Sequence, residues 1–101
     1  MEPVPGKILK VAREFLGLTQ DETEGASAVS RKTIQRIERC DPVEVAYVYK
    51  LQLFYIAQGI KFVSPTEQEG WGVFNSNTKD NPDKLNKLTF IPQGKRQRGQ
   101  K

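Results

Sequence analysis

The chain is 101 residues long, with 37% hydrophobic residues and a net charge of +4, which can support one small hydrophobic core. A single cysteine and the absence of histidine exclude an internal disulfide, zinc sites that need histidine, and catalytic triads that need a histidine base. No run is apolar enough to cross a bilayer and the N-terminus lacks the features of a signal peptide, so we expect a small cytoplasmic protein without metal or other cofactor.

The first predicted helix covers residues 7–16. Its apolar residues recur at helical spacing, at Ile8, Val11, Ala12 and Phe15. Gly17 follows as a C-terminal stop, because glycine readily adopts the positive φ that ends many helices. We expect this helix to pack on the two that follow it.

Two short helices joined by a tight turn come next. Thr19 and Glu22 are spaced as a capping box, in which each side chain accepts a hydrogen bond from the other's backbone amide, so a helix should begin near Gln20. Ser30 is placed to cap the second of the two helices. That helix has an apolar face formed by Ile34 and Ile37, with Val29 just before it. Its other face carries donors suited to phosphates and base edges, from Arg31, Lys32, Gln35, Arg36 and Arg39.

This segment resembles the helix-turn-helix of the phage Cro and repressor (XRE) family. The matching residues are Arg13, Leu16-Gly17-Leu18-Thr19-Gln20, Val29-Ser30, Thr33-Ile34 and Arg36-Ile37-Glu38-Arg39, in register without a gap. The resemblance covers residues 7–59. It implies a mainly α, lambda-repressor-like helical bundle that recognises specific sequences of double-stranded DNA.

The resemblance also implies roles for individual residues. The base-facing positions of the family fall on Arg31, Lys32, Gln35 and Arg36. The positions that contact phosphate fall on Arg13, Gln20, Ser30, Thr33 and Arg39. Arg13 has a second implied role as the ion-pair partner of Glu38, which would account for an acid in a basic helix.

Four positions depart from the family pattern. Thr23 stands where an apolar leucine is usual, and Gly25 lies inside a helix, where it costs roughly 1 kcal/mol relative to alanine. Ala28 replaces the usual glycine of the turn, so an altered turn geometry is expected. Cys40 stands where glycine often ends the second helix of the motif.

A longer helix and a β-hairpin are predicted after the motif. Asp41 as a cap, Pro42 as the first residue and Glu44 as the third indicate a helix that runs to about Gln58. Gly59 should end it. The segments 60–64 and 71–75 then alternate as two strands around a loop at 65–70.

The helix and the hairpin carry more apolar surface than one small core requires. An isolated two-stranded hairpin is marginal in water, so it should pack on the helix or pair with a second subunit. We predict a homodimer interface at Tyr47, Phe54, Tyr55, Phe62 and Trp71. Burial of this surface beneath the C-terminal segment is the alternative.

The last part of the chain is polar and then basic. Residues 76–101 are expected to form a polar connector and tail outside a domain at 1–75, with Leu85, Leu88, Phe90 and Ile91 docking as a helical turn or a last strand before Pro92. The tail at 94–101 holds four cations and no acid. It is expected to be either a disordered, solubilising end or an arm that binds phosphates nonspecifically.

These observations predict a sequence-specific transcriptional regulator, a dimeric repressor of phage or mobile-element type, associated with the nucleoid. The alternative is a protein-interaction module, such as an antitoxin or an adaptor that binds a protein partner. An enzyme is not expected, because the acids of the helices have no paired-acid motif or phosphate loop beside them.

Overall fold

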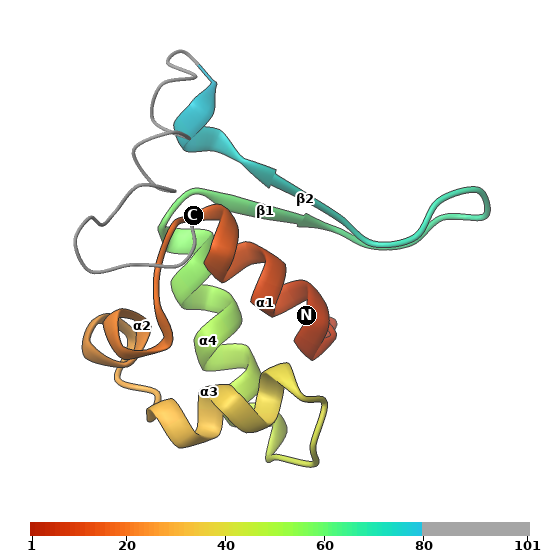
Figure 1. Ribbon diagram of the computed structural model, residues 1–101. Coiled ribbons are helices and arrows are strands. Elements are labelled where there is room, and N and C mark those ends of the chain that lie inside the picture. Colours follow the sequence, from red (N-terminus) through yellow and green to blue (C-terminus); the bar gives the residue numbers. More distant parts are fainter. Residues whose placement is uncertain (80–101) are drawn as a thin grey trace.

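The computed structural model describes residues 1–79 as a mainly helical domain with one antiparallel hairpin (Figure 1), so the mainly α class and the β-hairpin predicted from the sequence are present. No helix within these residues is long and apolar enough to span a bilayer. The elements in chain order are α1 (Gly6–Phe15), α2 (Gln20–Ser27), α3 (Arg31–Glu38), α4 (Val45–Ala57), β1 (Ile60–Val63), β2 (Gly72–Asn75) and a 3₁₀ helix, η1 (Ser76–Thr78).

The core lies between α1, α3 and α4, with α2 packed against α3 and α4 and the hairpin packed on α1 and α4. Its largest fully buried side chains come from each helix and from the turn before α3: Leu9, Thr23, Val29, Ile34, Leu51 and Tyr55. Gly6 allows α1 to begin directly against the end of α3, because a Cβ at this position would lie 1.8 Å from the carbonyl oxygen of Ile37.

The turn that ends α1 and the turn that ends α3 have the same hydrogen-bond pattern. After α1, Gly17 adopts φ 73° and the amide of Leu18 donates to the carbonyl of Arg13 at 3.1 Å. After α3, Cys40 adopts φ 64° and the amide of Asp41 donates to the carbonyl of Arg36 at 2.9 Å. Both ends are therefore Schellman motifs, so Cys40 takes a left-handed position that favours glycine.

The prediction that α4 begins just after Asp41 was wrong, because the helix begins at Val45. Glu44 precedes it without a side-chain capping bond. The backbone of Asp41 belongs instead to the turn that ends α3, and its carboxylate accepts hydrogen bonds from Arg39 at 2.8 and 3.1 Å. The end of α4 agrees with the prediction, since Gly59 follows it at φ 105°.

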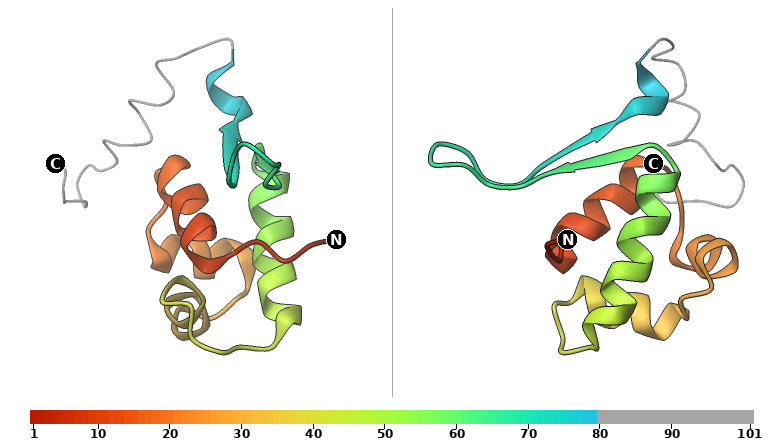
Figure 2. Two further views of the ribbon diagram at one scale, coloured as in Figure 1. Left: turned by 90° about the vertical axis from the view of Figure 1, so that its right-hand side faces the viewer. Right: turned by 180° about the vertical axis from the view of Figure 1, so that it is seen from behind.

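The hairpin pairs Ile60 with Asn75 at its base and Val63 with Gly72 at its outer end. Asn75 is buried, and its amide donates to the carbonyl of Phe15 at 2.9 Å, which ties β2 to the end of α1. Past Val63 the chain continues as a long arm that projects away from the helices and returns to Gly72 (Figures 1 and 2). The base of the hairpin is thus part of the core, whereas the arm is not.

The first five residues form what we call the N-terminal strap, which the sequence did not indicate. The strap passes beside α4 (Figure 2, left). The side chain of the buried Gln52 accepts from the amide of Val4 and donates to the carbonyl of Glu2, both at 3.0 Å. Tyr49 Oη donates to the carbonyl of Met1 at 2.8 Å. The side chain of Gln52 therefore takes the place of a β-strand partner, because it pairs with one amide and one carbonyl of the strap.

The described part of the polar connector is helical. Ser76–Thr78 forms η1, and the side-chain amide of Asn77 donates to the carbonyl of Gln58 at 2.8 Å. The later predictions lie outside the described residues: Leu85, Leu88, Phe90, Ile91 and the basic tail at 94–101.

Candidate nucleic-acid interface

The start of α2 is held by its own side chains. Thr19 Oγ1 accepts from the amide of Glu22 at 3.0 Å, and Glu22 Oε1 accepts from the amide of Thr19 at 2.8 Å. This is the capping box expected from the sequence, and it satisfies two amides that the first turn leaves unpaired. The starting point of α2 is thereby set at Gln20.

The turn between α2 and α3 keeps a left-handed residue although it lacks glycine. Ala28 adopts φ 65° and ψ 18°, so the alanine itself takes the left-handed conformation, and the expected change of the turn relative to the family stays a prediction. An L-residue in this conformation costs about 1–2 kcal/mol. Ser27 Oγ accepts from the amide of Val29 at 3.1 Å, and Ser30 Oγ caps α3 by accepting from the amide of Thr33 at 3.1 Å. These two serines hold the turn in place.

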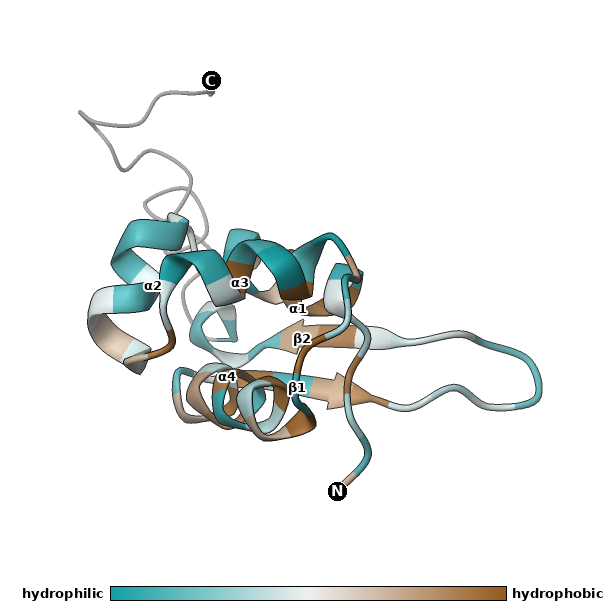
Figure 3. Ribbon diagram, turned by 90° about the horizontal axis from the view of Figure 1, so that it is seen from below, coloured by the Kyte–Doolittle hydropathy of each residue, from teal (hydrophilic) through white to brown (hydrophobic). Residues whose placement is uncertain are grey.

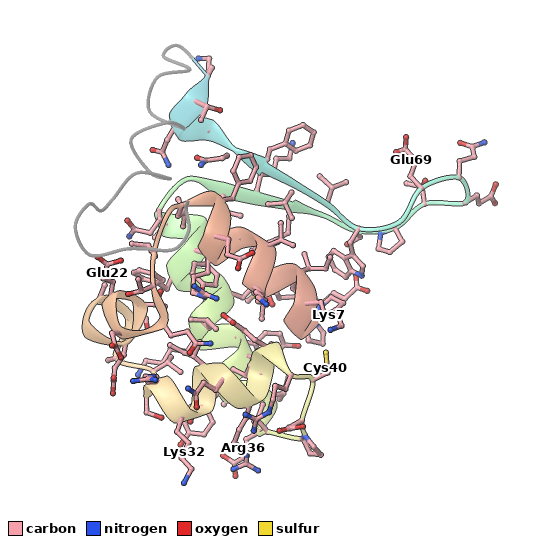
Figure 4. All side chains as sticks on the ribbon, viewed as in Figure 1. Lys7, Glu22, Lys32, Arg36, Cys40 and Glu69 are labelled. Atoms are coloured by element: carbon pink, nitrogen blue, oxygen red, sulfur yellow. The ribbon has the colours of Figure 1, made fainter. Side chains whose placement is uncertain are left out.

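The two faces of α3 differ as the sequence predicts. Ile34 and Ile37 are buried in the core on its inner face. On the outer face, Lys32 and Arg36 point away from the bundle (Figure 4), and Arg31 and Arg39 are exposed as well. Gln35 and Thr33 are half-buried at the edges of this face, next to the exposed Ser30. We call the outer face of α3 the cationic face; it consists of Arg31, Lys32, Gln35, Arg36 and Arg39.

Three arginines of the cationic face have partners within the chain. Arg31 Nη1 lies 3.3 Å from Asp21 Oδ1, and Arg39 Nη2 lies 2.8 Å from Asp41 Oδ2. Arg36 Nη2 donates to the carbonyl of Pro42 at 3.5 Å. These contacts are exposed, and exposed ion pairs contribute at most about 1 kcal/mol. An anionic ligand could therefore take their place at little cost.

A buried cluster of three side chains fixes α3 against α1 and α2. Arg13 Nε donates to Glu38 Oε2 at 2.6 Å and Arg13 Nη2 donates to Glu38 Oε1 at 3.0 Å, so the ion pair expected from the sequence is present and bidentate. Gln20 Nε2 donates to Glu38 Oε1 at 3.0 Å. Arg13 Nη1 also donates to the carbonyl of Leu18 at 2.8 Å.

The cluster is largely removed from water, since the side chains of Arg13 and Glu38 are 11% and 5% exposed. Burial by itself lowers the pKa of Arg13, but the hydrogen bond and the charge of Glu38 together outweigh it and raise that pKa. Arg13 is therefore charged at every accessible pH. Arg13 and Gln20 are placed to hold α3, and the phosphate contacts expected of them stay predictions.

Thr23 and Tyr55 lie in the core where α2 meets α4. Thr23 is fully buried and its hydroxyl donates to the carbonyl of Thr19 at 2.9 Å, so it replaces the usual leucine without an unpaired polar atom. The hydroxyl of Tyr55 has no hydrogen-bond partner among the described residues, and burial raises its pKa above the usual value for tyrosine.

The prediction that Tyr55 contacts a second subunit was wrong, because its side chain is fully buried in the core. Phe54, Phe62 and Trp71 are half-buried and pack against the core, and Tyr47 is 45% exposed. The sequence also did not identify Asp21 and Asp41 as partners of Arg31 and Arg39. For Asp41 a signal existed, since it lies two residues from Arg39, whereas Asp21 meets Arg31 only through the packing of α2 on α3.

Comparisons with protein-family models, with curated proteins and with solved structures found no match for this chain.

Proposed function

We propose that the chain is a sequence-specific DNA-binding regulator with a lambda-repressor-like helix-turn-helix, in which α3 enters the major groove. The observation that carries the proposal is the cationic face on a helix whose opposite face is locked into the core. The major groove admits an α-helix, and arginine or lysine can donate two hydrogen bonds to the O6 and N7 of guanine. Lys32 and Arg36 point outward, and the hydrogen bond of Arg36 to the carbonyl of Pro42 is long, at 3.5 Å, and exposed.

The residues divide into two groups by role. Arg31, Lys32, Gln35 and Arg36 would read base edges. Contacts to phosphate would come from Arg13, Gln20, Ser30, Thr33 and Arg39, which would fix the register of α3 on the duplex. Asp21 and Asp41 lie next to two of the arginines, so DNA binding would exchange a carboxylate partner for a phosphate or a base.

The buried cluster supports the proposal because base reading needs a rigid helix. Glu38 receives three hydrogen bonds, two from α1 and one from α2, so α3 cannot rotate about its axis without breaking them. Preorganised donors lose less entropy on binding than mobile ones. Two copies bound to a near-palindromic operator would present two such helices to the same side of DNA, about one helical turn apart. Occupation of such an operator would repress the adjoining genes.

The test is selection of binding sites from a random pool of duplex DNA at physiological salt. The full chain should enrich an inverted repeat, and the double variant Arg31→Ala/Arg36→Ala should relax base preference by about 1–3 kcal/mol at each affected position. Lys32→Ala should weaken binding more than Lys61→Ala, which removes the same charge and side chain from the hairpin. No enriched sequence, or the same sequence and affinity in the double variant, would contradict the proposal.

A further inference from the structure

One face of α4 is apolar and largely uncovered by the described residues, apart from Tyr49, which is half-buried and bonded to the N-terminal strap. Ala46, Tyr49, Leu53 and Ile56 follow one another at intervals of three, four and three residues, and we call them the α4 seam. Leu53 is 51% exposed and Ile56 44%, and Ala46 is also exposed. Val45 lies beside the seam and is 50% exposed, while Lys50 is the one charged residue of α4.

The spacing of the seam is that of a helix face that packs on another helix. Intervals of three and four residues keep side chains on one stripe, and two parallel helices bury such stripes against each other. Residues Tyr47 and Phe54 lie more than about 100° around the helix from the middle of this stripe, at about 100° per residue. The seam is therefore a different surface from the interface predicted from the sequence.

The orientation of α4 suits a second copy as the occupant, given the proposed binding of DNA by the cationic face. α4 runs from the α3 end of the molecule to the hairpin end (Figure 1). Viewed from the α3 end, α4 lies along one side of the bundle, opposite α1, α2 and α3 (Figure 3). A two-fold axis that runs along α4, just outside the seam, would keep both cationic faces at the same end of the pair. We propose that the α4 seam packs in parallel against the α4 seam of a second copy, and this orientation rests on the proposed function.

The size of the seam indicates how strong this pairing is. α4 has 13 residues, and a helix of this length is about 20 Å long and about 10 Å wide. Such a stripe buries less than the roughly 800 Å² per partner of a standard stable interface. The dimer is thus weak in solution and is completed when two copies occupy adjoining half-sites. One residue at the edge of the seam is already held in place, because Tyr49 donates a hydrogen bond to the N-terminal strap.

Disulfide trapping tests the pairing. In the full chain with Cys40→Ser, Leu53→Cys should give a covalent dimer on oxidation, because equivalent positions of parallel helices face each other across a two-fold axis. Tyr47→Cys in the same background is the matched control on the same helix and should stay monomeric. Adding duplex DNA with two half-sites from the selection should raise the cross-linked fraction of Leu53→Cys at least threefold, whereas DNA with one half-site should not.

A second variant separates pairing from DNA binding. Leu53→Glu should weaken binding to the two-site duplex at least tenfold and leave binding to one half-site unchanged. Cross-linking of Leu53→Cys at high protein concentration without any DNA binding would support the seam and contradict the regulator. DNA binding without cross-linking at Leu53→Cys, or with equal cross-linking at Tyr47→Cys, would overturn the seam and leave the regulator standing.

Discussion

Neutralising Glu38 should strongly destabilise this fold. Glu38→Gln keeps the volume of the side chain but removes the buried counter-charge of Arg13, whose side chain is 11% exposed, and leaves it only the exposed carboxylate of Glu14 at 4.0 Å. One of the two oxygens that accept from Arg13 and Gln20 becomes an amide donor. Breaking one partner of a buried ion pair costs about 3–5 kcal/mol, because the remaining charge is left desolvated.

That loss is large compared with the total stability. At about 0.05–0.15 kcal/mol per residue, a domain the size of the 79 described residues has a free energy of unfolding of about 4–12 kcal/mol. The variant should therefore unfold at a much lower urea concentration than the native chain. Unfolding is measured by the circular dichroism of the helices, and the m-value, the slope of the unfolding free energy against urea concentration, should be unchanged. Asp21→Asn, which breaks the exposed pair with Arg31, is the matched control and should cost less than about 1 kcal/mol.

The double variant Arg13→Met/Glu38→Met tests the reasoning behind this magnitude. Replacing both partners removes the buried charges together, and such replacements are often neutral or stabilising. The double variant should be at least about 2 kcal/mol more stable than Glu38→Gln. A cost below 1 kcal/mol for Glu38→Gln, or a double variant as unstable as the single one, would show that the cluster is not desolvated as described.

Four further substitutions should change the stability of the fold in a stated direction, which thermal or urea unfolding can measure. Tyr55→Phe should stabilise the fold by up to about 1 kcal/mol, because the hydroxyl is buried without a partner. Above pH 10 the unfolded chain releases the proton of Tyr55, whereas burial keeps it bound in the folded chain, so the free energy of unfolding falls by about 1.4 kcal/mol per pH unit. Tyr55→Phe should remove this loss of stability. Gly25→Ala should raise the melting temperature by about 4–8 °C, since nothing lies within 4 Å of the added Cβ and alanine favours helix by about 1 kcal/mol; a decrease would mean that α2 packs differently. Gly6→Ala should lower it, because its Cβ would overlap the backbone of Ile37, and an unchanged value would contradict this close approach. Ala28→Gly should be stabilising by about 1 kcal/mol at φ 65°, and a destabilised variant would argue against a left-handed turn.

The local signals of the sequence were reliable where one side chain acts on a neighbouring backbone. The capping box of Thr19 and Glu22, the Ser30 cap and the glycine stops after α1 and α4 all involve partners within five residues. The exception is Asp41, where two local signals competed. Asp41 followed by Pro42 is typical of a helix start, but Asp41 instead closes the turn after α3 and pairs with Arg39, so α4 begins later.

Contacts between distant residues were predicted only where a resemblance supplied them. Arg13 and Glu38 are 25 residues apart, and their pair was expected because both matched family positions. Gln52 and Asn75 bind backbone groups 48 to 60 residues away, and nothing near either residue indicates this. The same limit explains the wrong prediction for Tyr55. Helical spacing shows that a residue lies on an apolar face, but it does not show whether that face is covered by its own chain or by a second one.

The N-terminal strap has a consequence for how the chain folds as it is synthesised. Met1, Glu2 and Val4 are synthesised before their partners, which lie 48 to 62 residues later in the chain, at Tyr49, Gln52 and Ser64. The buried Val4 therefore has no core to enter until α4 has been made. The hydrogen bonds that hold the strap can therefore form only after α4 and the first strand of the hairpin have been made, so they are among the late contacts of the fold.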